Sequence, residues 1–460
     1  MSNSILGKVV QAEAVKTSQL DPKRTRQIVW LLAGSVALMM TGFGIILPVF
    51  ARRLSELGSG VEALGWMTMA FALAQFIMSP WLGGWADRFG RKPLILIALA
   101  GFVLANIAYL LATSVPMYIA IRGIAGGITA GLFPAAMGVV ADVVPPKDRA
   151  RWIGVVMGGY GAGIVFGPVV GGVLYDSFGF AMPFLSSAVM ATLALLAAVI
   201  LLPETRPVTI RRREALRMRR DKQIEPAEAT SFWQALPKPT ILFATLLMMD
   251  FIPQFAFTFI EPPMVFYFYD VLSWSTSQFG LVVGAYGLAM MLGQTLLGQM
   301  SDRFGRKPVI LLGLSLSISL YVGLIFAREF WLILLLAGAA GLGIALFNPA
   351  LSALYLDVTP EQHRSRVQGI KGSALSLGGV LGPLSVAVTS DWLTAQEIFT
   401  IAGVVVFAGV VWAAIFLFEP EKSGNSSDLS SDIMEQRSLA AQATLRGLVL
   451  NARAIRQQRP

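Results

Sequence analysis

The sequence predicts an all-α polytopic membrane protein with twelve transmembrane helices in two related six-helix bundles. Of its 460 residues, 55% are hydrophobic and only 14% are charged, whereas an ordinary soluble domain carries about 25% charged residues. Apolar runs of about 20 residues, the length that crosses a bilayer core of about 30 Å, recur between residues 27 and 418. The runs show no period-two alternation, which excludes a transmembrane barrel because backbone groups in lipid must be bonded within a helix or a closed sheet.

The apolar runs divide the chain into two bundles and three polar segments. The predicted N-terminal bundle covers 28–202 and the C-terminal bundle 240–418, joined by a basic linker at 203–239 and flanked by tails at 1–27 and 419–460. The predicted spans are 28–50, 64–86, 93–112, 116–141, 152–174, 181–202, 240–266, 278–300, 308–327, 331–356, 367–388 and 396–418.

The basic residues predict the orientation of these spans. Most of the 36 Lys and Arg residues fall in the tails, the linker and the loops on one side, Lys371 near the start of the eleventh span among them. Short loops rich in Lys and Arg stay in the cytoplasm, so both termini are predicted to be cytoplasmic in a multi-pass protein of the inner or plasma membrane. Residues 1–26 have no apolar core, so no cleavable signal is predicted. The pI of about 9.8 therefore reflects topology, and no nucleic-acid partner is expected.

The residue types also argue against an enzyme or a cofactor protein. Cysteine is absent and His363, in a predicted loop, is the sole histidine, so neither a disulfide nor a transition-metal site is expected. The sequence contains no phosphate-binding GxxxxGK[ST] motif, which argues against ATP hydrolysis. We therefore expect no catalytic residues, no metal and no cofactor.

The two halves of the sequence match each other at one constant offset. The segment GWADRFGRKP (84–93) matches QMSDRFGRKP (299–308) at a shift of 215 residues, with seven identities. Two parallel six-helix copies, related by an axis along the membrane normal, are typical of transporters whose substrate site lies near mid-bilayer between the copies. The same shift relates Pro48 to Pro263, Gly65 to Gly280, Pro134 to Pro349, Asp142 to Asp357, Gly167-Pro168 to Gly382-Pro383, and Asp176 to Asp391.

The repeated loop resembles the signature of the major facilitator superfamily, and the resemblance extends over about residues 28–418. The resemblance implies alternating access and a cytoplasmic charge network, in which Asp87 and Arg91 pair with Asp142. The second copy would pair Asp302 and Arg306 with Asp357. The alternative is that these arginines only anchor the loops in the cytoplasm. The glycine before each Arg-Lys pair should adopt φ > 0. The signature GxxxDRxGRK is present as Gly83, Asp87, Arg88, Gly90, Arg91 and Lys92, and again as Gly298, Asp302, Arg303, Gly305, Arg306 and Lys307.

The fifth span carries a glycine stripe with four-residue spacing, which puts the missing side chains on one helix face and permits close approach by a neighbouring helix. The pattern is similar to the span-5 motif of drug/proton antiporters in the superfamily. The second copy is degenerate, because Val386 stands where Gly171 maps. The alternative is generic packing of small residues. The motif residues are Gly163, Gly167, Pro168, Gly171 and Gly172.

Arg122 is the only basic residue well inside a predicted span. Burying it costs a few kcal/mol or more, so it should face a cavity or a carboxylate. Its position resembles the span-4 motif whose Arg takes part in proton transfer in antiporters, although Ala125 replaces the usual Gln. Its repeat equivalent is Ala337. The asymmetry favours a functional charge over a structural anchor.

Asp250 and Glu261 lie in the seventh span, 11 residues apart. That spacing places both carboxyl groups on one helix face, about 16 Å apart along the axis. Acids inside a span mark a proton or cation path by default. Their repeat equivalents are Ser35 and Ile46. The alternative is that Glu261, beside two prolines, lies at the outer interface.

Aromatic residues suggest the kind of substrate. A cavity lined by rings around a few acids suits lipophilic cations, through apolar burial and cation–π contact. The candidate cavity residues are Gln254, Phe257, Tyr160, Tyr286 and Phe347.

Taken together, the patterns predict a secondary active transporter that works by alternating access. Its expected activity is proton-coupled efflux of lipophilic or cationic small molecules by a monomer in the bilayer. Asp250 and Glu261 are expected to bind the proton, and Arg122 is expected to tune both acids. One alternative is an importer of a sugar or organic acid with the same fold, since PETR (203–206) also occurs in sugar porters. Another is a non-transporting receptor or assembly factor, which would not need intact loop signatures in both halves.

Overall fold

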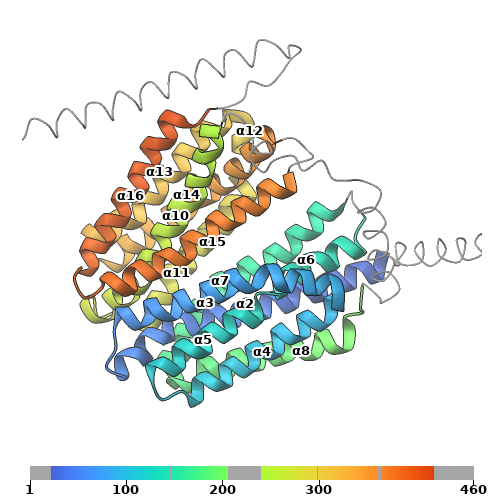
Figure 1. Cartoon of the computed structure of the whole chain (residues 1–460). Coiled ribbons are helices and arrows are strands. Elements are labelled where there is room, and N and C mark those ends of the chain that lie inside the picture. Colours follow the sequence, from blue (N-terminus) through green and yellow to red (C-terminus); the bar gives the residue numbers. More distant parts are fainter. Residues whose placement is uncertain (1–21, 146–147, 206–239, 298, 360–363, 419–460) are drawn as a thin grey trace, which may run out of the picture.

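The computed structural model describes residues 22–145, 148–205, 240–297, 299–359 and 364–418, and the described residues form helices joined by short turns (Figure 1). Twelve segments are long and apolar enough to cross a membrane, so the predicted all-α fold with twelve spans is confirmed. The N half contains α2 (Pro22–Glu56), α3 (Val61–Phe89), α4 (Arg91–Leu111), α5 (Val115–Thr129), α6 (Leu132–Val143), α7 (Arg149–Phe178) and α8 (Ala181–Leu201). The C half contains α10 (Thr240–Phe266), η3 (Tyr267–Val271), α11 (Thr276–Leu297), α12 (Met300–Phe304), α13 (Arg306–Phe326), α14 (Phe330–Val358), α15 (Arg364–Thr389) and α16 (Ala395–Phe416).

Two of the spans contain more than one helical element. Helices α5 and α6 form one span with an interruption between Thr129 and Leu132, where Gly131 lies three residues before Pro134. Proline cannot donate to the carbonyl four residues earlier, and the neighbouring glycine eases the bend. The counterpart α14 has Leu346 in place of Gly131 and continues through its own proline. In the C half, α10 continues into the π-helical η3 as one span.

The internal repeat is visible in the backbone and in side-chain contacts. Gly90 and Gly305 adopt φ of 108° and 92° at the turns before α4 and α13, so the expected positive φ is confirmed. Lys92 donates to the carbonyl of Val199 at 2.7 Å, and Lys307 donates to the carbonyl of Ala414 at 2.6 Å. Each lysine thereby satisfies a carbonyl near the C-terminus of the last helix of its half. The two interactions are related by the same offset of 215 residues.

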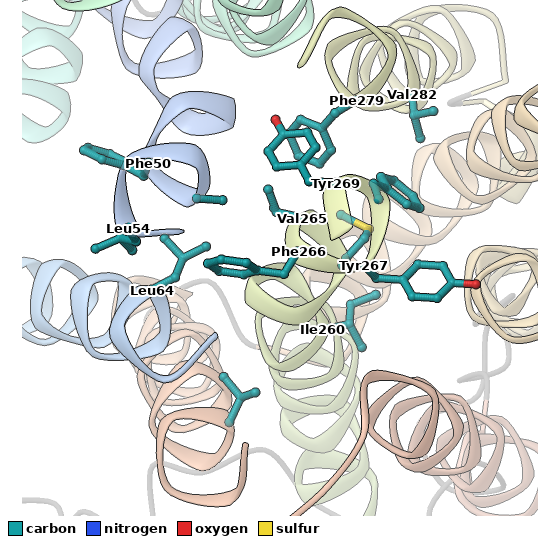
Figure 2. Packing of buried hydrophobic residues seen from close by; sticks show 14 of the residues in the cluster. Phe50, Leu54, Leu64, Ile260, Val265, Phe266, Tyr267, Tyr269, Phe279 and Val282 are labelled. Atoms are coloured by element: carbon teal, nitrogen blue, oxygen red, sulfur yellow. The ribbon is translucent and has the colours of Figure 1, made fainter. Parts of the chain in front are cut away.

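The hydrophobic core is shared by the halves at one end of the molecule only. We call the end with the turns at Gly90 and Gly305 the motif end, and the opposite end the far end. At the motif end, one apolar cluster lies within the N half and another within the C half. At the far end, a single cluster contains residues of both halves, and Figure 2 shows Phe266 of α10 pointing toward Leu64 of α3.

Close helix contacts between the halves lie toward the far end. A Cβ added at Gly280 of α11 would meet the backbone of Pro168 in α7, and one added at Gly65 of α3 would lie 3.0 Å from the Cβ of Ala387 in α15. Toward the motif end, a Cβ at Gly154 of α7 or Gly372 of α15 would meet no atom within 4 Å. The halves are therefore packed together at the far end and separate toward the motif end, as Figure 1 also shows.

Candidate functional site

The loop signature of the N half forms a network at the motif end. The Arg91 guanidinium lies 3.5 Å from the Asp142 carboxylate. The Glu204 carboxylate accepts the backbone N–H groups of Arg91 and Lys92, at 3.1 and 3.3 Å, where the positive end of the α4 dipole favours an anion. Thr205 donates to Asp142 at 3.0 Å. The family resemblance implies the Arg91–Asp142 pair, but nothing in the sequence indicates that Glu204 caps α4.

The signature of the C half forms a similar network. Arg306 pairs with Asp302 within the turn and with Asp357 of α14, at 3.1 Å. Arg306 also donates to Ser301 at 2.8 Å. In both halves, therefore, the arginine after the glycine joins its loop to the span two helices later, and each pair stays within one half.

The other arginines of the two signatures lie at the surface of the motif end. Arg88 and Arg303 are exposed, and a Cβ at Gly83 would meet no atom within 4 Å. Gly298 and the side chain of Asp87 lie outside the described residues, and so does His363.

The glycine stripe of the fifth span lies between two helices. A Cβ at Gly163 would lie 2.5 Å from the Cβ of Met40, and one at Gly167 would lie 2.7 Å from the Cα of Gly44. A Cβ at Gly171 would meet the Ile45 carbonyl. These three glycines thus allow α7 to contact α2 of the same half. Gly172 faces the other half instead, where a Cβ would lie 2.7 Å from the Cα of Ser277 in α11.

Arg122 is buried among aromatic rings of the N half. Its guanidinium carbon lies 4.8, 5.0 and 4.5 Å from the ring centres of Phe43, Phe50 and Phe71, and it is 6% exposed. The Tyr109 hydroxyl lies beside it. Cation–π contacts partly offset the loss of water around a buried cation, but they do not neutralise its charge.

Glu261, on α10 of the C half, lies within the range of electrostatic attraction to Arg122. Glu261 precedes Pro262 and lies between the deep part of α10 and the far end. Because the two side chains belong to different halves, their attraction acts across the interface along which the halves pack. The sequence predicts both residues as functional, and the structure places both beside the far-end cluster, Arg122 against Phe50 and Glu261 next to Ile260.

Asp250 has different neighbours from Glu261, although both lie on α10. Its carboxylate accepts a hydrogen bond from the Tyr355 hydroxyl at 2.7 Å and lies 3.9 Å from the Lys371 ammonium. Tyr355 and Lys371 belong to α14 and α15 of the same half. The expectation that Arg122 acts on both acids is therefore wrong for Asp250, because about 16 Å of helix separates the two carboxyl groups.

Lys371 also corrects the expectation that Arg122 is the only basic residue well inside a span. Lys371 lies seven residues after the start of α15, and its side chain is 14% exposed. The positive-inside pattern explains a lysine near the start of a span, so the sequence gives no reason to pair it with Asp250.

The candidate aromatic residues fall into separate places. Phe257 stacks on Tyr286 of α11 with ring centres 5.8 Å apart, and Tyr160 packs edge-on against Phe133. Phe347 is 2% exposed and lies in the apolar cluster of the C half, against Gly313. Its assignment to the cavity is wrong, because the rotation of α14 turns it toward α13. Gln254 is half-buried next to α15.

Comparison with known proteins identifies the family. The model of the major facilitator superfamily matches residues 30–267 and 251–456. The class C tetracycline resistance protein of Escherichia coli is 31% identical over 365 residues, which cover 77% of this chain and 88% of that protein. The chain belongs to the major facilitator superfamily.

Other relatives of this superfamily member agree in length and fold. Multidrug resistance protein 2 of Bacillus subtilis (strain 168) is 26% identical over 381 residues, covering 83% of this chain and 92% of that protein. The crystal structure of a D-xylose–proton symporter superposes with a TM-score of 0.67 at 18% identity, covering 86% of this chain and 99% of that one, a likeness that shows the fold alone. The chain is thus a transporter rather than an enzyme.

Polar contacts also close the far end of this superfamily member. Arg52 of α2 donates to the Trp274 carbonyl at 2.8 Å and lies 3.9 Å from the ring centre of Tyr269. The Tyr269 hydroxyl donates to the Pro48 carbonyl at 2.8 Å. The carboxylate of Asp176, near the end of α7, accepts the first backbone N–H groups of α11. The conformation is therefore closed at the far end by bonds between the halves, which the sequence does not reveal.

Proposed function

We propose that this transporter exports lipophilic small molecules in exchange for protons, by rocking its two halves about a site between them. The resistance proteins to which the chain is similar support export of drug-like compounds. The observation that carries the proposal is the placement of opposite charges on the two halves beside one shared apolar cluster: Arg122 faces Phe50, and Glu261 follows Ile260, in the far-end cluster. Arg122 is buried and Glu261 is half-buried, and their repeat equivalents are the uncharged Ala337 and Ile46.

The two charges couple protonation to the movement of the halves. While the far end is closed, ionised Glu261 and Arg122 attract each other, and opening the far end would separate two charges inside the membrane, which is costly. An empty transporter with an ionised Glu261 is therefore held closed at the far end. A proton on Glu261, or a substrate between the two charges, removes that hold. Proton and substrate then cross in alternate half-cycles, as antiport requires.

Asp250 is a second proton-binding carboxyl group in this proposal. It is 5% exposed and belongs to the same helix as Glu261. Acids at this depth are costly to bury, so their presence there supports a role in transport. The Phe257–Tyr286 stack and Gln254 provide apolar and polar surface for a substrate between the acids.

The basic residues support a cytoplasmic location of the motif end. Lys and Arg gather at the motif end and in the segments that flank it, so we place the motif end and both termini in the cytoplasm. The far end then faces outward, and the described conformation is open toward the cytoplasm. Because one chain supplies both halves of the site, the monomer is the proposed working unit. The Arg91–Asp142 and Arg306–Asp357 pairs are proposed to restrain the loops as the motif end opens and closes.

Nutrient import is less well supported than export. The relatives that match the chain over most of its length carry drug-resistance names, whereas the xylose symporter shares only the fold. A receptor role would leave the charge interaction between the halves without a purpose.

Dye efflux from proteoliposomes under an imposed pH gradient tests the proposal. Wild-type protein should export rhodamine 123, and the Asp250→Asn, Glu261→Gln double variant should bind the dye without responding to the gradient. Asp270→Asn is the matched control, since Asp270 is an exposed acid at the far end of the same span. An unchanged pH dependence in the double variant would remove both acids from coupling.

A further inference from the structure

Asp250, Lys371 and Tyr355 form a group of polar side chains inside the C half that the proton-coupling scheme only partly uses. The N half provides an internal comparison, because the repeat equivalents of Lys371 and Tyr355 are Val156 and Val140. Both valines are fully buried in the apolar cluster of the N half. The fold therefore does not need charges at this place, and replacing a buried ion pair by apolar residues is often neutral or stabilising. Retaining the pair in one half alone indicates a task other than stability.

The contacts of the Lys371 ammonium group do not use all of its hydrogen-bond donors. An ammonium group has three N–H donors. Lys371 donates to Ser352 Oγ at 2.9 Å, and the Asp250 carboxylate lies 3.9 Å away, which is longer than the 2.7–2.9 Å typical of a charge-assisted hydrogen bond. Asp250 is meanwhile held by Tyr355 at 2.7 Å. Lys371 therefore forms an attraction to Asp250 but no hydrogen bond with it.

Lys371 is also the more accessible member of the pair. Its side chain is 14% exposed, whereas that of Asp250 is 5% exposed. A Cβ at Gly369 or Gly372, beside Lys371 on α15, would meet no atom within 4 Å. Figure 1 shows α15 on the side of the C half that faces the N half. A molecule that enters between the halves from the motif end thus meets a positive charge before it meets Asp250.

We propose that Lys371 is a specificity-determining residue that binds a carboxylate group on the exported molecule. The inference rests on the proposed function and refines its substrate class, from lipophilic cations to compounds that also carry an acidic group. The deep charges of the described spans, Arg122, Asp250, Glu261 and Lys371, balance in sign. A zwitterion keeps that balance in a region of low dielectric constant, whereas a simple cation adds an uncompensated charge. The aromatic stack of Phe251 on Phe255 begins one residue after Asp250 and supplies an apolar surface for the body of such a compound.

A matched pair of dyes tests this inference. Rhodamine 110 carries a free carboxylate, and rhodamine 123 is its methyl ester, so the two differ only in the group that Lys371 would bind. Transport is measured in proteoliposomes of phosphatidylcholine alone, which contain no anionic headgroups to occupy Lys371. A hydrogen bond between two charged groups is stronger than one between neutral groups. Wild type should therefore show a KM for rhodamine 110 about tenfold lower than for rhodamine 123, equivalent to about 1.4 kcal/mol.

The variant Lys371→Met should abolish this preference by raising the KM for rhodamine 110 about tenfold. The KM for rhodamine 123 should change by less than about twofold, because the ester makes no ionic contact. Lys23→Met, which replaces an exposed lysine at the start of α2, is the control and should keep the preference. Equal KM values for the two dyes in wild type, or an equal change in both in Lys371→Met, would overturn the inference while leaving efflux intact. Transport of neither dye would refute the proposed function itself.

Discussion

Removing the Asp176 carboxylate should open the far end more often. Asp176 accepts the backbone N–H groups of Thr276 and Ser277, at 3.2 and 2.8 Å, and the Ser277 hydroxyl at 2.5 Å. These bonds cap α11 of the C half with a side chain of the N half. Because the site is exposed, each bond contributes about 0.5 kcal/mol, the low end of the usual range. Asp176→Ala should thus destabilise the closed far end by about 1.5 kcal/mol, about tenfold in the equilibrium.

Site-directed labelling measures this change, since the chain contains no cysteine. Leu64→Cys places a thiol in the far-end cluster, where Leu64 is 6% exposed. The rate at which an impermeant maleimide labels this thiol in intact cells should rise about tenfold with Asp176→Ala. Asp391→Ala is the control: Asp391 is the repeat equivalent, but Glu62 stands where Ser277 maps, so it cannot cap α3 in the same way. Equal labelling rates for Asp176→Ala and wild type would refute the reasoning.

Two glycine substitutions test the helix contacts and the turns. Gly163→Ala should lower stability by about 1–3 kcal/mol through overpacking against Met40 and Thr41. Gly161→Ala on the same helix is the control, because its new Cβ would meet open space. Equal midpoints of thermal unfolding in detergent for the two variants would contradict the contact. Gly90→Ala should cost about 1–2 kcal/mol, because φ is 108° there and the new Cβ would meet Glu204. Gly84→Ala should be tolerated, because its new Cβ would have no neighbour within 4 Å. A lower unfolding midpoint for Gly84→Ala than for Gly90→Ala would contradict the strained turn.

The fold is predictable from the sequence because its main determinants are local. Continuous apolar runs specify the spans within a few residues, and the repeated GRKP segment specifies two turns at which φ must be positive. The interruption at Gly131 is less predictable, because the second copy carries a proline at the same place and continues as one helix.

The candidate site is predictable only in part. Depth and asymmetry identify Arg122, Asp250 and Glu261, since an ionisable residue inside a span is costly and the other copy lacks it. The partner of each charge depends on the rotation and packing of helices far apart in sequence. Lys371 is therefore counted among the basic residues at the cytoplasmic end of its span, and Phe347 is wrongly assigned to the cavity. The far-end contacts belong to one conformation of the cycle, which the sequence alone does not specify.

Proton release on substrate binding tests the central claim most directly. Purified transporter in weakly buffered detergent solution, brought to a pH at which the two acids are protonated and then mixed with rhodamine 123 in the presence of a pH indicator, should release protons in proportion to the dye bound. The Asp250→Asn, Glu261→Gln variant should bind the dye and release none. Dye binding to wild type without proton release, in a preparation that still exports dye under a pH gradient, would contradict exchange at these two acids.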